Sequence, residues 1–305
     1  DQMKLKSYES EPLPITLPFR KYADGVNGNI YFRNDPKKIR LSTLIKGIES
    51  DHPVFKEKSR RGDILDILPT GNLVLDVDTS RLIANGIVKP EIKSLIESPI
   101  SWTLKDNPIS KANLIQLDIL AHNDWERPIY FVTGGNDGSL NLENYFQQEG
   151  LAYRLVPVKS EGGDSYLRVG RVEIDILYKN LMENFSWGRM NEADVNIDYY
   201  NVRTFAVIRF RNNFIRLAEE LIREGKKDSA IAVLDRCMEL APDRSLPYDQ
   251  YISGATYSLG KDKGEVHYPG IIEMYYKCSE FEKGNRLLTE HFKILKQDID
   301  YYKAL

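Results

Sequence analysis

The first two thirds of the chain alternate between strand-like and helix-like spacing of hydrophobic residues. Asn72 to Val77 switches between apolar and polar residues at nearly every step, which is the period of a half-buried strand. Leu41 to Glu49 repeats its apolar residues three and four positions apart, and the run that begins at Pro90 does the same. The pattern therefore predicts strands and short amphipathic helices in alternation.

Proline and charge mark the segments between these elements. Glu11 to Phe19 (EPLPITLPF) is interrupted by prolines and predicts an extended strap that lies over a surface. The basic run Lys56 to Arg61 predicts a solvated loop, and Thr79 or Ser80 predicts the cap of a short helical turn.

Asn113 to Gly135 contains more residues that indicate secondary structure than any other segment of similar length in the chain. Ser110 predicts the N-cap of a helix that runs to Ala121, and the polar residues after it mark the helix exit. Pro128 to Val132 predicts a short strand, since a strand tolerates proline at its first residue. We expect this helix, loop and strand to lie at the centre of an α/β layer.

The residues after Gly135 predict that this layer continues. Leu140 to Gln148 predicts a helix, and Tyr153 to Val158 predicts a second strand. A strand, a crossover helix and a second strand are typical of a parallel pair. The expected fold is therefore α/β, with a small mixed or parallel sheet and flanking helices.

From Asp198 onward the apolar spacing is helical throughout. One helix is predicted from about Tyr199 to Glu224, where Gly225 ends it, and a second follows from Asp228 or Ser229. The predicted organisation is an extended and α/β segment over residues 1–108, an α/β domain that continues the sheet over 109–197, and an all-α domain over 198–305.

The helical part carries the signature of a repeat. Arg211 to Arg244 has the length and layout of one tetratricopeptide repeat, with Ala218 and Ala230 at the small-residue contacts between its two helices. Tyr268 to His291 predicts a second helix pair, with Gly284 at the corresponding contact. Ser245 to Gly264 predicts a further helix between the two pairs.

The first helix of such a repeat lines a concave groove. In this register five side chains face the groove and predict a surface that binds a protein or peptide; they are Asn212, Ile215, Glu219, Ile222 and Arg223. The alternative interpretation is a helix that packs only within its own fold.

The loop after the central helix is a second candidate site. Trp125 has the ring to stack on a sugar, and Arg127 has the planar donors that bind a carboxylate or phosphate. Asn123, Gly134 and Gly135 complete this candidate ligand loop, although the glycines have neither dinucleotide-binding nor phosphate-loop spacing. The alternative is that Trp125 fills the domain core and the polar residues satisfy the loop.

Composition narrows the classes of function. The net charge of -3 and the pI of about 6.0 give no reason to expect nucleic acid as a partner. The four histidines are scattered without metal spacing, and no nucleophile and base pair is evident, so we expect no metal, no cofactor and no catalytic residue. Cys237 and Cys278 predict buried free thiols.

Three segments resemble one family of proteins: LDILAHNDWERPIYFVTGG, LENYFQQEGLAYRLVPV and RFRNNFIRLAEELIREGKKDSAIAVLDRCMELAPD. They look like the C-terminal soluble part of bacterial polytopic membrane proteins related to protein O-mannosyltransferases. The resemblance implies that a membrane-embedded N-terminal portion, absent from this chain, carries the glycosyltransferase activity. It supplies no catalytic residue to this chain.

The resemblance implies a non-catalytic module on the periplasmic face of the inner membrane, and the repeat signature predicts that it binds protein partners or acceptors through its helical repeats. Because the chain begins at Asp1, we expect it to be one part of a longer protein. Two alternatives remain open: a soluble sugar- or nucleotide-binding α/β domain, and a purely structural cap.

Overall fold

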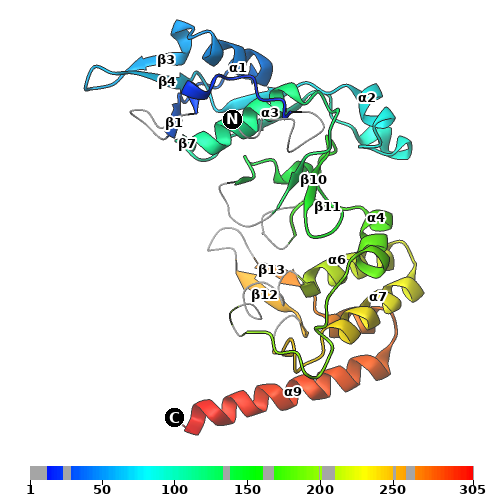
Figure 1. Cartoon of the computed structure of the whole chain (residues 1–305). Coiled ribbons are helices and arrows are strands. Elements are labelled where there is room, and N and C mark those ends of the chain that lie inside the picture. Colours follow the sequence, from blue (N-terminus) through cyan, green and yellow to red (C-terminus); the bar gives the residue numbers. More distant parts are fainter. Residues whose placement is uncertain are drawn as a thin grey trace. The chain divides into compact units, whose positions relative to one another are not determined.

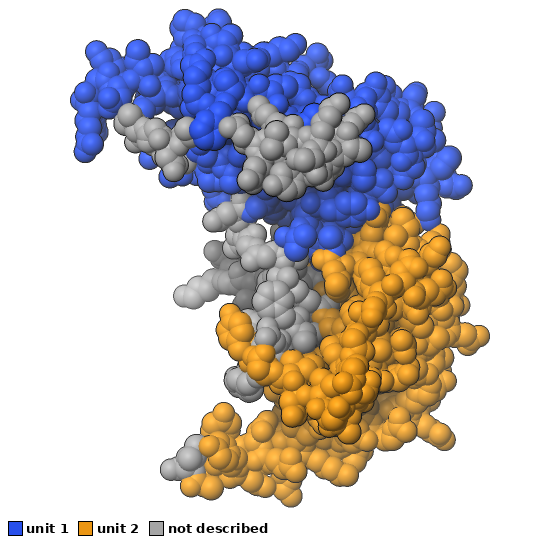
Figure 2. All heavy atoms as spheres, in the orientation of Figure 1, with its two compact units in different colours: residues 1–147, 152–164, 169–171 blue, residues 148–151, 165–168, 172–305 orange. Residues whose placement is uncertain are grey.

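The computed structural model of the chain describes residues 12–22, 29–132, 138–160, 168–198, 200, 210–249, 252–258 and 265–304. Two compact units divide the chain (Figure 2). Unit 1 is Asp1–Gln147, Ala152–Asp164 and Val169–Arg171, and unit 2 is Gln148–Leu151, Ser165–Arg168 and Val172–Leu305. The chain therefore contains both the mixed α and β part and the C-terminal helical region that the sequence predicts.

Unit 1 contains three small sheets and short helices (Figure 1). Its helices are η2 (Phe19–Lys21), α1 (Leu41–Glu49), η3 (Pro53–Phe55), α2 (Thr79–Ala84), η4 (Pro90–Leu95), α3 (Lys111–His122) and η6 (Glu143–Tyr145). Its strands are β1 (Asn29–Phe32), β2 (Ile39–Arg40), β3 (Lys56–Lys58), β4 (Ile64–Leu68), β5 (Asn72–Leu75), β6 (Ile100–Thr103), β7 (Ile109–Ser110), β8 (Tyr130–Phe131), β9 (Phe146–Gln148), β10 (Tyr153–Leu155) and β11 (Arg171–Val172), of which β9 and β11 each have their last residue in unit 2.

Two of the sheets of unit 1 are mixed. One sheet has the strand order β3-β4-β1-β7, with β1 parallel to β4 and antiparallel to β7. A second has the order β2-β5-β6, with β5 parallel to β2 and antiparallel to β6. Helices α1 and α3 pack on each other, α3 contacts β1 and α1 contacts β5, so both sheets share one hydrophobic core.

Helix α3 has the predicted N-cap. The Ser110 hydroxyl accepts a hydrogen bond from the Asn113 amide at 3.1 Å, and the Asn113 side chain accepts one from the Ser110 amide at 3.0 Å. This reciprocal capping box satisfies two backbone donors that the first turn of a helix leaves unpaired. Leu114, Leu117 and Leu120 point into the core, so the helix is held by both its cap and its apolar face.

The third sheet corrects two predictions. Leu140 to Gln148 is not a helix, because Leu140 and Asn141 have positive φ angles of 54° and 63° that a helix does not accommodate. After a short turn, β9 instead becomes an interior strand in the order β11-β9-β10-β8. The described residues 138–152 of the connection contain no crossover α-helix, and β8 pairs with β10 antiparallel rather than parallel.

Two smaller predictions also differ. The first residues of the predicted basic loop form β3, because they pair antiparallel with β4 and Lys56 reaches the carboxylate of Asp66 at 2.7 Å. The cap of α2 is Asp78 rather than Thr79 or Ser80. Its carboxylate accepts hydrogen bonds from the amides of Ser80 and Arg81, as an N-cap carboxylate does.

Unit 2 consists mainly of helices. Its elements are α4 (Ile174–Lys179), the π-helical turn η7 (Asn180–Asn184), α6 (Asn212–Arg223), α7 (Lys227–Leu240), the strands β12 (Ala255–Ser258) and β13 (Glu265–Tyr268), α8 (Ile271–Lys277) and α9 (Phe281–Ala304). Its core is separate from that of unit 1. In the part that the structure describes, no helix combines the length and the apolar character needed to cross a bilayer.

Helices α6 and α7 pack as a pair, as do α8 and α9. Ala218 and Ala230 are fully buried, which is consistent with their predicted places at the contact between α6 and α7. A Cβ atom on Gly284 of α9 would lie 2.5 Å from the ring of Tyr276, so the second pair also requires a small residue. Gly225 ends α6 with a φ angle of 76°, as the sequence predicts.

The segment between the helix pairs is a β-hairpin, which corrects the prediction of an all-α domain. Ala255 pairs with Tyr268 and Ser258 pairs with Glu265, so β12 and β13 are antiparallel. The aromatic and β-branched residues in this segment favour a strand over the predicted helix. The N-terminal part of the long helix predicted from Tyr199 lies largely outside the described residues.

Arg211, directly before α6, fixes the chain that follows α7. Its guanidinium donates hydrogen bonds to the carbonyls of Leu246 and Pro247, the latter at 2.7 Å, and lies 5.3 Å from the ring centroid of Tyr248. The side chain is fully buried, and this burial lowers the pKa of the guanidinium from its ordinary value. The guanidinium of a buried arginine still remains protonated, so the two carbonyls face a charged donor.

We expect Arg211→Lys to destabilise unit 2 by about 2 kcal/mol, because a single ammonium lacks the planar fork that serves both carbonyls. Arg236→Lys is the matched control. Arg236 pairs with Glu239 on the surface of α7, and its replacement should change stability by less than about 0.5 kcal/mol. Amide hydrogen exchange, followed separately in each unit, measures the loss of stability. Equal protection of unit 2 in the two variants would contradict the expected role of Arg211.

Candidate functional site

The predicted groove residues lie on α6, but only part of this face is open. Ile215 is 2% exposed and belongs to the core of unit 2, which corrects its assignment to an open groove. Six consecutive residues of α6, 213–218, are buried, because the helix contacts α4 and α8 as well as α7. Asn212 and Ile222 are half-buried, and Arg223 is exposed.

The charged end of α6 forms a small ion-pair network. The guanidinium of Arg168 donates to Glu219 at 2.8 Å, and Arg223 lies 3.3 Å from the other oxygen of the same carboxylate. Arg223 also donates to Glu220 at 2.6 Å. Arg223 is exposed whereas Glu219 and Glu220 are partly buried, and solvent-accessible ion pairs contribute only about 0–1 kcal/mol to stability. Their more important effect is to present a guanidinium and carboxylates together at one surface.

The sequence did not indicate that Arg168 belongs to this network. Arg168 and Glu219 are separated by 51 positions, and the sequence around Arg168 has no periodic pattern. No spacing rule connects two such residues. Glu219 and Arg223 were both assigned to the groove, and their ion pair has the spacing of neighbours four residues apart on one helix.

The predicted ligand loop uses its side chains within the fold. Trp125 is 6% exposed, and its indole N–H donates to the carbonyl of Asp76 at 2.9 Å. The Asn123 amide donates to the carbonyl of Arg127 at 2.8 Å, and the Arg127 guanidinium donates to the carbonyl of Pro12 at 3.2 Å. The indole face is therefore closed to a sugar in this conformation.

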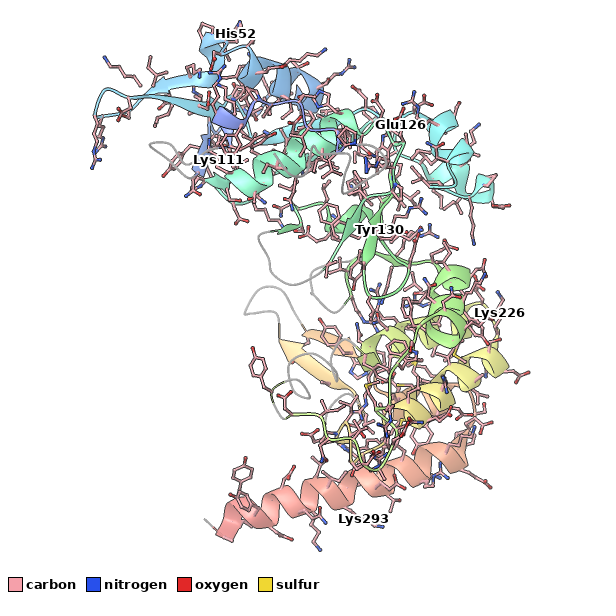
Figure 3. The ribbon with its side chains drawn as sticks, in the orientation of Figure 1. His52, Lys111, Glu126, Tyr130, Lys226 and Lys293 are labelled. Carbon is pink, nitrogen blue, oxygen red and sulfur yellow. The ribbon has the colours of Figure 1, made fainter. Side chains whose placement is uncertain are left out.

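The backbone of the same loop is strained. Asp124 and Trp125 have consecutive positive φ angles of 45° and 58°, which are unfavourable for residues with a Cβ atom. This turn directs the indole inward while Glu126, labelled in Figure 3, remains exposed. Gly134 and Gly135 lie outside the described residues, so their predicted part in this site stays a prediction.

Asp118 fastens the N-terminal strap to α3. Its fully buried carboxylate accepts hydrogen bonds from the amides of Thr16 and Leu17, both at 2.9 Å, and from the hydroxyls of Thr16 and Tyr22. The ring of His122 lies 2.9 Å from the same carboxylate. Burial and the hydrogen bond to Asp118 raise the pKa of the Tyr22 phenol, so the phenol stays protonated and donates. The strap predicted from its prolines thus has a specific anchor.

A second cluster fixes the end of the strap. Lys21 is buried, and its ammonium lies 3.1 Å from Asp66 and also donates to Asp51. Lys56 contacts the same two carboxylates at 2.7 and 2.5 Å. The hydrogen bonds from Lys21 and Lys56 hold the pKa of the Asp51 carboxyl well below its usual range. Two cations and two anions compensate one another, which is how a buried lysine is tolerated.

The described part of unit 1 also has a shallow surface hollow that no sequence motif indicated. Strands β1, β3 and β4 and the loop after β3 line it with aromatic, aliphatic and charged groups: Tyr31, Phe32, Arg33, Glu57, Lys58, Ser59, Leu65 and Ile67. Residues from three strands meet here only through the pairing of the sheet. Because they are separated along the chain, no local motif connects them.

Metal binding and thiol reactivity are the two other kinds of chemistry to consider. Among the residues that the structure describes, no group of three or more histidine, cysteine, aspartate or glutamate side chains is placed to hold a metal ion. Cys237 and Cys278 are buried free thiols, as the sequence predicts, and burial raises the pKa of Cys237 to about 12. A thiol with such a pKa is a poor nucleophile at neutral pH.

The comparisons with known proteins place the chain in a class and then in a family. It contains a domain associated with a family of membrane proteins. More specifically, the family model of TMEM260-associated domain 2 matches residues 1–176, so the chain belongs to that family. The match covers more than half of the chain, including all of unit 1 and the first residues of unit 2. No curated protein and no solved structure matches the chain.

Proposed function

We propose that the chain is a non-catalytic module of a membrane glycosyltransferase-like protein and that unit 2 binds the protein on which the transferase acts. Membership of TMEM260-associated domain 2 supports the link to the membrane protein. The resemblance to the soluble part of O-mannosyltransferase-related proteins supports a position on the periplasmic face, next to the membrane-embedded portion of the same protein.

The exposed charged end of the α6 and α7 helix pair is the observation that supports the proposed binding role. We take the pairs α6–α7 and α8–α9 as tetratricopeptide-like repeats, which are modules that bind proteins. Arg223 offers donors to a carboxylate, and the neighbouring carboxylates of Glu219 and Glu220 offer acceptors to a cation. A polypeptide that carries both charges fits this surface.

The test uses the full-length transferase, with and without Arg223→Glu, in a glycosyl transfer assay on a protein acceptor. Loss of a contact that is equal in the ground and transition states raises KM and leaves kcat unchanged. A lost charged contact of about 1.5 kcal/mol corresponds to an increase of about tenfold in KM. Thermal unfolding of the variant checks that the fold is retained.

Arg236→Glu is the matched control, because Arg236 also lies on the helix pair and pairs with a glutamate three residues away. It should leave both kinetic constants unchanged. A fall in kcat with an unchanged KM for Arg223→Glu would argue for a role in the chemical step. No change in either constant would overturn acceptor binding at this surface.

A further inference from the structure

Helix α9 extends well beyond the core that holds its first half. Gly284, Leu287 and His291 are buried against unit 2, whereas every described residue from Lys296 onward is exposed. Figure 3 shows the labelled Lys293 on the outer side of this helix. The exposed part is not uniformly polar, since Phe292, Ile299 and Tyr302 are 61%, 52% and 73% exposed. The ring of Tyr302 contacts that of the adjacent Tyr301, and Phe292 and Ile299 are largely exposed to solvent.

These side chains follow a regular spacing. Leu288, Phe292, Leu295, Ile299 and Tyr302 are separated by four, three, four and three residues. This is the spacing of the a and d positions of a heptad repeat, which forms the seam between helices of a coiled coil. We call Phe292, Leu295, Ile299 and Tyr302 the α9 seam. It extends over about 15 Å of helix, so it is long enough for a short helix pair.

The charges beside the α9 seam indicate which helix fits it. With Phe292 and Ile299 at a positions, Lys296 and Lys303 occupy e positions and Asp298 occupies a g position. In a parallel pair of identical helices, each g residue faces the e residue that follows in the other helix. Asp298 of one copy then faces Lys303 of the second copy, and the same pair forms twice by symmetry.

The other arrangements are less favourable. In an antiparallel pair, e positions face e positions and g positions face g positions, so lysines would meet lysines and Asp298 would meet Asp298. A negatively charged bilayer surface would attract Lys296 and Lys303 beside the seam but repel Asp298, whereas a second copy pairs Asp298 with Lys303. The charge pattern is therefore complementary to a second copy of the same helix.

We infer that α9 pairs in parallel with α9 of a second copy of this chain along the α9 seam. The core of unit 2 fixes the first half of the helix, which reduces the entropy that the exposed half loses when it pairs. Because the seam is short, the association is weak and depends on protein concentration. This inference concerns α9 alone and is independent of acceptor binding at Arg223.

Sedimentation velocity of the 305-residue chain over concentrations from about 1 to about 200 μM tests the inference. The expected result is a monomer at the low end and a dimer at the high end. Ile299→Asp should abolish the dimer. Gln297→Asp introduces the same side chain on the opposite side of the helix and should leave the dimer intact. A monomer at every concentration would overturn the inference, as would equal effects of the two variants.

Cross-linking tests the parallel register. In a parallel pair the d positions face each other, so Tyr302→Cys should form a disulfide between copies under mild oxidation. Cys237 and Cys278 are buried and provide a background that does not react. A dimer that lacks this cross-link would exclude the parallel register. Co-sedimentation with phosphatidylcholine and phosphatidylserine vesicles, lost in Ile299→Asp without any dimer, would assign the seam to a membrane surface instead.

Discussion

Replacement of Asp118 by leucine is expected to lower the free energy of unfolding of unit 1 by about 3 to 5 kcal/mol. Leucine is close to aspartate in size, but it accepts no hydrogen bond. The amides of Thr16 and Leu17 and the hydroxyls of Thr16 and Tyr22 would lose their common acceptor. Buried donors left without a partner bear the full cost of removal from water. Amide hydrogen exchange should show the loss in unit 1 and leave unit 2 unchanged.

Asp78→Ala is the control for this variant. Its carboxylate also accepts two backbone amides, but as the exposed cap of α2 it should contribute only about 1 kcal/mol. Limited proteolysis adds a local measure, because release of the strap should expose the bonds near Leu17, which is fully buried in the native fold. Similar costs for the two variants, or a strap that stays protected, would show that Asp118 is not the anchor.

Gly170→Ala is expected to cost unit 1 about 3 kcal/mol or more. Gly170 has a φ angle of 66°, which disfavours any residue with a Cβ atom. A Cβ atom there would also lie 2.1 Å from the carbonyl oxygen of Phe146 in β9, the neighbouring strand of β11. Because the obstacle is backbone, the strands must move apart, and the substitution has no rotamer that avoids the clash.

Gly86→Ala separates the cost of backbone strain from the cost of the steric clash. Gly86 has a similar φ angle of 62°, yet nothing lies within 4 Å of the position that a Cβ atom would occupy there. The strained backbone alone should cost about 1 to 2 kcal/mol. Urea unfolding followed by hydrogen exchange in unit 1 compares the two variants. If Gly86→Ala proves as costly as Gly170→Ala, backbone strain rather than the contact with Phe146 dominates.

The sequence predicts best the elements that are determined by residues close to one another along the chain. The helix over Leu41 to Glu49 has the predicted bounds, because its apolar spacing alone defines the buried face. Ser110 caps α3 as predicted, since a capping box involves residues only three positions apart. The helix pairs of unit 2 were visible because small residues such as Ala218 and Gly284 recur where helices approach closely.

The features that were missed depend on partners far along the chain. Phe146 to Gln148 looked helical, but a position between two other strands determines its conformation. The carboxylate of Asp118 lay on a recognisable helix, yet its partners are about a hundred positions earlier. The open part of the α6 face could not be read from its register, because the burial of Ile215 depends on how other helices of unit 2 cover it.

The anchor at Asp118 also has a consequence for the order of folding. Thr16 and Asp118 are 102 positions apart, so the bonds between them close a very long loop of chain. Closing such a loop costs entropy before its contacts form, and long-range contacts of this kind slow folding. During synthesis the strap has no acceptor until α3 has left the ribosome. Until then Leu17, which is buried in the native fold, remains exposed to water, and such exposure of apolar side chains favours aggregation.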